Sequence, residues 1–261
     1  MTGSRVEPRV LDLVARAMGR FAMLRPGDRV AVGVSGGKDS LCLLSALVAC
    51  RRRAPFQYEL VAVTVEQGKF KADIRTIEAS IARLGVPWVL RRDAATLCLV
   101  ADGVAHGCDV CSRHRRRVLY QAAGDLGCSV LALGHTADDC AESLLRNILF
   151  NGRIASLPPV SRSRRGALRL IRPLVFVPES LTEAWARAHG VPTVGCVCGD
   201  RDSVRRELRA FLAGLRTRRA GVAESIVAAL GNVNPYTLLD PALVKAGADP
   251  SPAFGEDRAP R

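Results

Sequence analysis

The chain has 261 residues, of which 48% are hydrophobic and 24% are charged. This balance is typical of a folded globular protein and excludes a chain that is disordered over most of its length. The formal net charge is +13, and only four of the 38 basic residues are lysines. A genomic preference for arginine codons and an arginine-lined surface for polyanions both explain that bias, and charge alone does not separate them.

Short apolar runs alternate with helical spacings along the chain. Apolar residues at helical spacing predict a first helix between Val10 and Phe21. Buried strands are predicted at 29–34, 59–65, 87–90 and 129–133, and helices at 39–49, 74–84, 112–126, 137–150 and within 202–230. Strands that alternate with helices predict an α/β fold, built on a doubly wound parallel sheet with flanking N- and C-terminal helices.

The same pattern predicts four parts of the chain. They are an N-terminal helical segment (1–27), an α/β domain (28–200), a C-terminal helical segment (201–245) and a disordered tail rich in Pro, Gly and charge (246–261). A membrane span is excluded because no run of about 18 uncharged apolar residues exists. The chain opens without a secretory segment, so we expect a cytoplasmic protein with reduced cysteines.

A glycine-rich loop lies where the first strand hands over to a helix. Its residues are Ser35, Gly36, Gly37, Lys38, Asp39 and Ser40. The glycines let backbone N–H groups approach an anion, and the N-terminus of the following helix adds partial positive charge. Lys38 offers a point charge to phosphate, and Asp39 could hold a magnesium ion. The spacing is neither a Walker A loop nor Gly-x-Gly-x-x-Gly.

A second polar motif, Gly134-His-Thr-Ala-Asp-Asp139, follows the strand predicted at 129–133. His135 and Asp139 are four residues apart at the start of a helix, so they are expected to share one face. They are candidates for nucleotide or metal binding, and a helix-capping role is the structural alternative for His135.

Nine cysteines occur, too few for a disulfide scaffold in a chain of this length. Cys108 and Cys111 form a C-x-x-C before a basic helix, and Cys196 and Cys198 form a second close pair. Two close pairs far apart suggest one metal site assembled in space, with four thiolates for zinc or three for a [4Fe–4S] cluster. We expect the other five to be buried fillers: Cys42, Cys50, Cys98, Cys128 and Cys140.

The hexapeptide from Ser35 to Ser40 resembles the signature of the PP-loop ATP pyrophosphatases. With Cys108-Asp-Val-Cys111-Ser-Arg, Ile171-Arg-Pro-Leu174 and the cysteines near Pro192, the chain is similar to the TtcA family of tRNA 2-thiocytidine synthases over roughly 10–234. The resemblance implies ATP, Mg²⁺ and a [4Fe–4S] cluster held by Cys108, Cys111 and a third cysteine. Cys198 aligns best as that third ligand, and Cys196 is the alternative because one residue separates this pair where the family usually has two.

This resemblance implies a tRNA thiolase that adenylates cytidine 32 and then replaces AMP by sulfur. The implied site residues are Ser35–Ser40, His135 and Asp139 for ATP, with Asp39 and Cys198 as catalytic candidates. It also implies tRNA as partner, a sulfur donor such as a cysteine desulfurase, no membrane, and a homodimer as one expected assembly.

Arginines gather in two places that suit a tRNA backbone: Arg113, Arg115, Arg116 and Arg117 after Cys111, and Arg205 and Arg209 near the C-terminal end. Cations at a helix N-terminus are unfavourable unless an anion binds there, which favours function for the first group. A solvated helix surface is an equally good explanation of the second group.

Two other functions stay open. The altered distal cysteine pair would suit thiolation of another tRNA base or of a small molecule. A non-enzymatic zinc or redox RNA-binding protein is disfavoured by the intact glycine loop.

Overall fold

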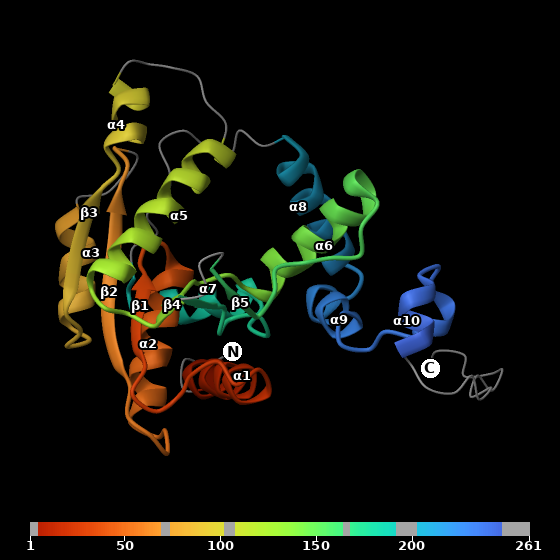
Figure 1. Ribbon diagram of the computed structural model, residues 1–261, viewed down its shortest axis with the longest axis horizontal. Helices are drawn as coiled ribbons and strands as arrows, with labels where there is room; N and C mark the ends of the chain where they lie inside the picture. Colours follow the sequence, from red (N-terminus) through yellow and green to blue (C-terminus); the bar gives the residue numbers. More distant parts are fainter. Residues whose placement is uncertain (1–4, 69–73, 102–107, 164–167, 192–202, 247–261) are drawn as a thin grey trace. The chain divides into compact units, whose positions relative to one another are not determined.

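The computed structural model describes residues 5–68, 74–101, 108–163, 168–191 and 203–246 (Figure 1). The chain divides into two units, residues 1–227 and 228–261. The second unit contains a 3₁₀ helix η2 (Pro235–Thr237) and the helix α10 (Pro241–Ala246). The four-part division made from the sequence stays a prediction, and its tail falls almost wholly on residues outside the described ranges.

The first unit is built on a six-stranded sheet in the order β3-β2-β1-β4-β6-β5. Its strands are β1 (Arg29–Gly33), β2 (Glu59–Glu66), β3 (Trp88–Arg92), β4 (Val130–Ala132), β5 (Val160–Arg162) and β6 (Arg169–Ile171). All neighbours pair in parallel except β5, which runs antiparallel to β6 at the sheet edge. The predicted α/β class is therefore confirmed, with a correction: the sheet is mostly, not wholly, parallel. The strands β5 and β6 were missed because each contains a charged residue and neither shows the continuous apolar run that revealed the equally short β4.

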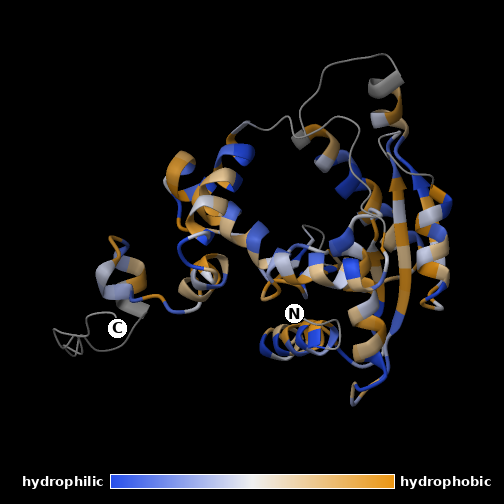
Figure 2. Cartoon of the chain, turned by 180° about the vertical axis from the view of Figure 1, so that it is seen from behind, coloured by the Kyte–Doolittle hydropathy of each residue, from blue (hydrophilic) through white to orange (hydrophobic). Residues whose placement is uncertain are grey.

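Helices cover both faces of this sheet. Successive side chains of a strand point to opposite faces, so apolar residues on both faces have to be covered. Val30 and Val32 share a core cluster with apolar residues of several helices, whereas Ala31 belongs to a second cluster with α5 (Cys108–Asp125). Most of the helical residues of the first cluster come from α1 (Val6–Arg20), α2 (Lys38–Arg51), α3 (Ile74–Ala82) and α7 (Glu179–Ala188). Figure 2 shows the strands mostly in hydrophobic colours, which is expected of strands that are buried on both sides.

Three further helices extend the first unit. Ala141, Leu212 and Ala223 form a small apolar cluster that joins α6 (Ala137–Asn151), α8 (Ser203–Arg216) and α9 (Val222–Ala229). The helices α4 (Ala94–Ala101) and α7 were not predicted; α7 shows a helical apolar spacing at Leu181 and Trp185 that could have revealed it.

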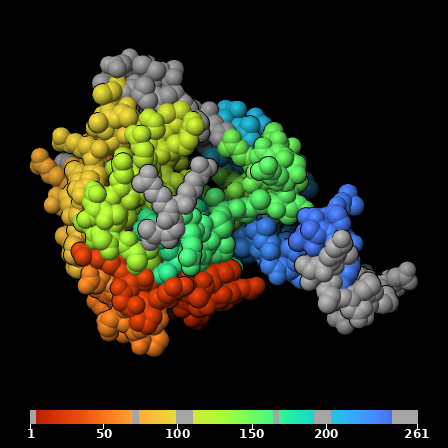
Figure 3. All heavy atoms as spheres, viewed as in Figure 1, coloured from red at the N-terminus to blue at the C-terminus, as the bar shows by residue number. Residues whose placement is uncertain are grey.

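The predicted N-terminal helix is confirmed as α1, and it begins at Val6, four residues earlier than expected. Figure 3 shows the atoms of α1, coloured red, at the surface of the unit. Its inner face is nevertheless part of the main core, since Val10, Val14 and Ala17 are fully buried against α2 and α7. Across the described residues, no helix combines the length and the apolarity needed to cross a membrane.

Candidate functional site

The glycine loop connects β1 to α2 and is held in shape by its own serines. The Ser35 amide donates to Ser40 Oγ at 3.1 Å, and Ser40 Oγ donates to the Gly37 carbonyl at 2.9 Å. Gly36 has a φ of 79°, a conformation that favours glycine. No side chain of Gly37 can cap α2, so the first amides of this helix are suited to bind an anion.

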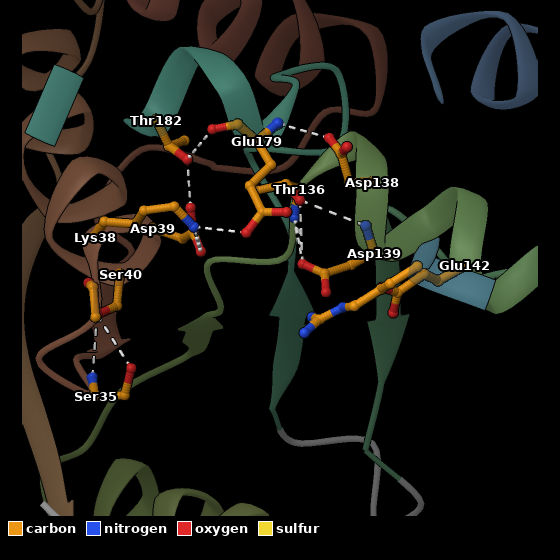
Figure 4. A network of polar contacts seen from close by, with 12 residues as sticks. Ser35, Lys38, Asp39, Ser40, Thr136, Asp138, Asp139, Glu142, Glu179 and Thr182 are labelled. Atoms are coloured by element: carbon orange, nitrogen blue, oxygen red, sulfur yellow. Dashed lines mark hydrogen bonds and ion pairs between the residues drawn. The ribbon is translucent and has the colours of Figure 1, made fainter. Parts of the chain in front are cut away.

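Lys38 and Asp39 face two residues of α7 (Figure 4). Lys38 Nζ donates to Glu179 Oε1 at 2.6 Å and to Asp39 Oδ2 at 3.2 Å. The Thr182 hydroxyl donates to Asp39, and Thr182 is fully buried. Glu179 and Thr182 were missed in the sequence because they lie about 140 residues from the loop and match no motif. These contacts join the start of α2 to α7, and the roles in phosphate and cation binding expected of Lys38 and Asp39 stay predictions.

The pKa values of this pair reflect burial and mutual attraction. Burial alone lowers the pKa of Lys38, but the Glu179 and Asp39 carboxylates outweigh it, so the pKa of Lys38 is raised. Burial raises the pKa of Asp39, and the Thr182 hydrogen bond and the Lys38 charge offset only part of that increase. A cation at Asp39 would act against this upward shift of the pKa, because it stabilises the ionised carboxylate.

The second polar motif lies directly against the glycine loop. A Cβ added to Gly134 would be 3.1 Å from the Asp39 carbonyl oxygen and 3.2 Å from Ser40 Cα. Only a glycine allows this close approach without moving the start of α2. The carboxyl ends of β1 and β4 are thus in contact, at the point where the order of the sheet reverses, which is the usual ligand position in such sheets.

Asp139 and Asp138 both bind backbone amides at the starts of helices. Asp139 accepts from the Thr136 amide at 2.9 Å, and its own amide donates to Thr136 Oγ1, which completes a capping box. Asp138 accepts from the Glu179 amide at 2.6 Å and pairs with Arg216. The nucleotide-binding role expected of Asp139 stays a prediction, and Asp138 is the residue that links α6 to α7.

His135 is held in its neutral form at neutral pH. Its Nδ1 atom is buried with no hydrogen-bond partner among the described residues. Burial is the main cause that lowers the pKa of His135, to about 4; Asp139 opposes this change, and Arg172, Arg116 and Arg115 add to it. The expectation that His135 and Asp139 share one face of a helix was wrong, because α6 begins at Ala137 and His135 precedes its N-cap, Thr136.

The C-x-x-C opens α5 at the same edge of the sheet. The Cys111 side chain is buried, and its carbonyl oxygen accepts from Gln67 Nε2 at 3.0 Å. Gln67 follows β2 and also donates to Asp93 Oδ2 at 2.8 Å, directly after β3. Thr96 completes this network, since its hydroxyl donates to Asp93 at 2.6 Å. This network was not predicted from the sequence, although Gln67 and Asp93, each directly after a strand, could have suggested it.

Not all predicted cysteine ligands can be placed. Cys108 begins α5, but its side chain lies outside the described residues, as do Cys196 and Cys198 entirely. Among the residues that are described, no group of three His, Cys, Asp or Glu side chains could hold a metal ion. Cys42, Cys128 and Cys140 are buried and Cys50 is half-buried. Cys98 is exposed, so its prediction as a buried filler was wrong; the short helix α4 turns this face outward.

The two groups of arginines have different environments. Arg113, Arg115, Arg116 and Arg117 are all exposed on α5. Arg205, in contrast, pairs with Asp139 at 3.0 Å and with Glu142 at 3.0 Å, and Arg209 also pairs with Glu142. The prediction that these residues bind RNA stays untested, and in this structure Arg205 and Arg209 connect α8 to α6.

Comparison with known proteins shows similarity over almost the whole chain. The PP-loop domain family matches residues 8–209. A tRNA-cytidine(32) 2-sulfurtransferase from Anaeromyxobacter dehalogenans is 41% identical over 258 residues, which cover 97% of this chain and 88% of that protein. A protein of the same description from Syntrophotalea carbinolica is 39% identical over 252 residues, with 93% of this chain and 96% of that protein covered.

A solved structure confirms the fold. The U34-tRNA thiolase NcsA from Methanococcus maripaludis, solved with its [4Fe–4S] cluster, superimposes with a TM-score of 0.71. The match covers 88% of this chain and 79% of that chain at 23% sequence identity, a level that establishes shared architecture only.

Proposed function

This chain belongs to the PP-loop family and, within it, to the tRNA-cytidine(32) 2-sulfurtransferases, and from that premise we propose that it thiolates cytidine 32 of tRNA at the expense of ATP. The observation that carries the proposal is that the predicted motifs meet at one edge of the sheet. The glycine loop after β1, the motif after β4 and the start of α5 all converge there.

The first half of the reaction is activation of the base. Amides at the start of α2, together with Lys38, would bind the two outer phosphates of ATP, and Asp39 would hold Mg²⁺, which when bound neutralises phosphate charge. The cytosine carbonyl oxygen then attacks the α-phosphorus, so that an O–P bond forms and the bond to pyrophosphate breaks. The product is an adenylated base, whose AMP group leaves far more readily than an oxide.

The second half replaces that AMP by sulfur. We assign Cys108, Cys111 and Cys198 as ligands of a [4Fe–4S] cluster, which when bound supplies a place to hold sulfide for transfer. Cys111 suits this role because its buried side chain lies at the site edge and its backbone is fixed by Gln67. Formation of the C–S bond at the activated carbon expels AMP, which carries away the former carbonyl oxygen.

The partners follow from the same proposal. The exposed arginines of α5 lie beside the cysteine motif, where a tRNA backbone would have to pass, and their charge suits phosphate. The unstacked cytidine reaches the site from a loop of tRNA, in line with an aromatic content of 5% that leaves little surface for base stacking. We further propose a cytoplasmic homodimer that receives its sulfur from a cysteine desulfurase.

The test is mass spectrometry of tRNA nucleosides from a deletion strain that carries plasmid copies of the gene. The wild-type chain and the exposed α7 variant Glu183→Gln are expected to restore 2-thiocytidine, whereas Lys38→Met is expected to reduce it by at least about tenfold because a phosphate contact is lost. Pyrophosphate release from ATP by the purified chain with tRNA should show the same order. Unchanged 2-thiocytidine in the deletion strain would refute the assignment of cytidine.

A further inference from the structure

Two buried nitrogen atoms of the first unit have no hydrogen-bond partner among the described residues: His135 Nδ1 and Arg172 Nε. Such atoms are rare because an unpaired buried polar group costs free energy. They lie after neighbouring strands. Ala132 pairs with Ile171 at the carboxyl ends of β4 and β6; Arg172 is the next residue after β6, and His135 is the third residue after β4.

Arg172 is an unusual cation. It is 5% exposed, and Nη1 donates to the Pro158 carbonyl at 2.6 Å, but no carboxylate pairs with it within the described residues. Burial lowers the pKa of Arg172, and the charge of Arg116 on α5 lowers it further. A buried guanidinium normally has an anionic partner, and in the described part of the chain Arg172 has none.

The charges around His135 are predominantly positive. Arg172, Arg116 and Arg115 all act electrostatically on His135, and they approach it from the end of β6 and from α5. Asp139, at the start of α6, is the acidic group that acts on His135, and it is already engaged by the Thr136 amide and by Arg205. An anion placed among these groups would gain charge-assisted hydrogen bonds and relieve the repulsion among the cations.

We propose that Arg172, Arg116 and His135 form an anion subsite for the α-phosphate of the nucleotide, the phosphate that becomes AMP. This inference rests on the proposed function. The carboxyl end of β4 lies between the glycine loop, which would hold the outer phosphates, and the end of β6, which carries Arg172. The α-phosphate is the next group along the nucleotide, and a guanidinium there stabilises the charge that develops on the transferred phosphoryl group.

The test compares AMP with adenosine by calorimetry on the full-length chain purified without oxygen, since the difference in affinity measures the phosphate alone. The variants are Arg172→Lys, which keeps the charge but loses the planar fork, and the exposed Arg116→Gln, which is not expected to disturb folding. The control is Arg9→Gln, an exposed arginine on α1, across the sheet from α5.

We expect the wild-type chain to bind AMP more tightly than adenosine, and both site variants to lose about tenfold in AMP affinity. Adenosine affinity, pyrophosphate affinity and the control should not change. An AMP–adenosine difference that survives in both variants would overturn the subsite, as would a loss confined to tRNA binding, which would point to a backbone phosphate of tRNA instead. Because no sulfur transfer is measured, this result is independent of the nucleoside test of the proposed function.

Discussion

Asp39 shows how one residue of the glycine loop depends on a distant helix. Burial raises the pKa of its carboxyl group, while the hydroxyl of Thr182 and the ammonium of Lys38 lower it. The ionised form is the one that can bind a cation, so the hydrogen bond from Thr182 favours the form of Asp39 that the proposed magnesium site needs. Thr182 is a positioning residue in this account, because it acts on the nucleotide only through Asp39.

Replacement of Thr182 by valine tests that account, because valine has nearly the same shape but no hydroxyl. Loss of the bond removes a contribution that lowers the pKa of Asp39, so the acidic limit of Mg²⁺–ATP binding should move to higher pH. The free energy of unfolding should fall by about 1.5–3 kcal/mol, the usual contribution of a hydrogen bond to a charged group. Binding is measured by calorimetry across a pH series.

The control for this experiment is Thr182→Ser, which restores the hydroxyl and should restore the wild-type pH profile. A purely structural role for Thr182 predicts the loss of stability without the shift of the acidic limit, and that outcome would contradict the link to Asp39.

At the scale of elements, α6 is connected to two other helices through its acidic residues. Asp138 binds the first amide of α7, and Glu142 receives Arg205 and Arg209 of α8. Glu142 is 8% exposed, so its carboxylate contacts these two arginines away from solvent. The helix α8 begins directly after residues 192–202, which include Cys196 and Cys198. The ion pairs therefore fix the helix that follows the distal cysteine pair.

A double-mutant cycle of Glu142→Gln and Arg209→Gln measures this connection. We expect each change to lower the free energy of unfolding by about 1–2 kcal/mol, a discounted value because the Arg209 side chain is 45% exposed. The coupling energy should be at least about 0.5 kcal/mol and should decrease at high salt. Denaturant titration gives these values, with Glu183→Gln on α7 as the control. Strictly additive effects would show that the pair does not act as a connection.

At the scale of the whole molecule, topology brings together segments that are far apart in the chain. The glycine loop, Gln67, the start of α5 and the motif from Gly134 follow different strands, and parallel strands place all their carboxyl ends at one edge. The chain order reverses between β1 and β4, so that the connections on either side separate and leave that edge accessible to a ligand.

The proposed cluster is a property of this assembled edge, and iron and sulfide analysis after anaerobic purification tests it. We expect about four irons per chain in the wild-type protein and a large loss of iron in Cys111→Ser. The matched control is Cys50→Ser, since Cys50 is half-buried at the far end of α2 and should not affect iron content. One zinc per chain in place of iron would support the structural metal site instead.

The sequence by itself determined the α/β class, the four strands β1 to β4 and the position of the glycine loop between β1 and α2. These features depend on local patterns, namely apolar runs and glycines, which are visible in adjacent residues. The short strands β5 and β6 carry no such pattern. Only the tertiary structure decided three other features. They are the partners of Lys38 and Asp39, the hydrogen bond from Gln67 to the Cys111 carbonyl oxygen, and the burial of Arg172. Each of these joins residues from different elements, and no spacing along the chain encodes which elements become neighbours in space.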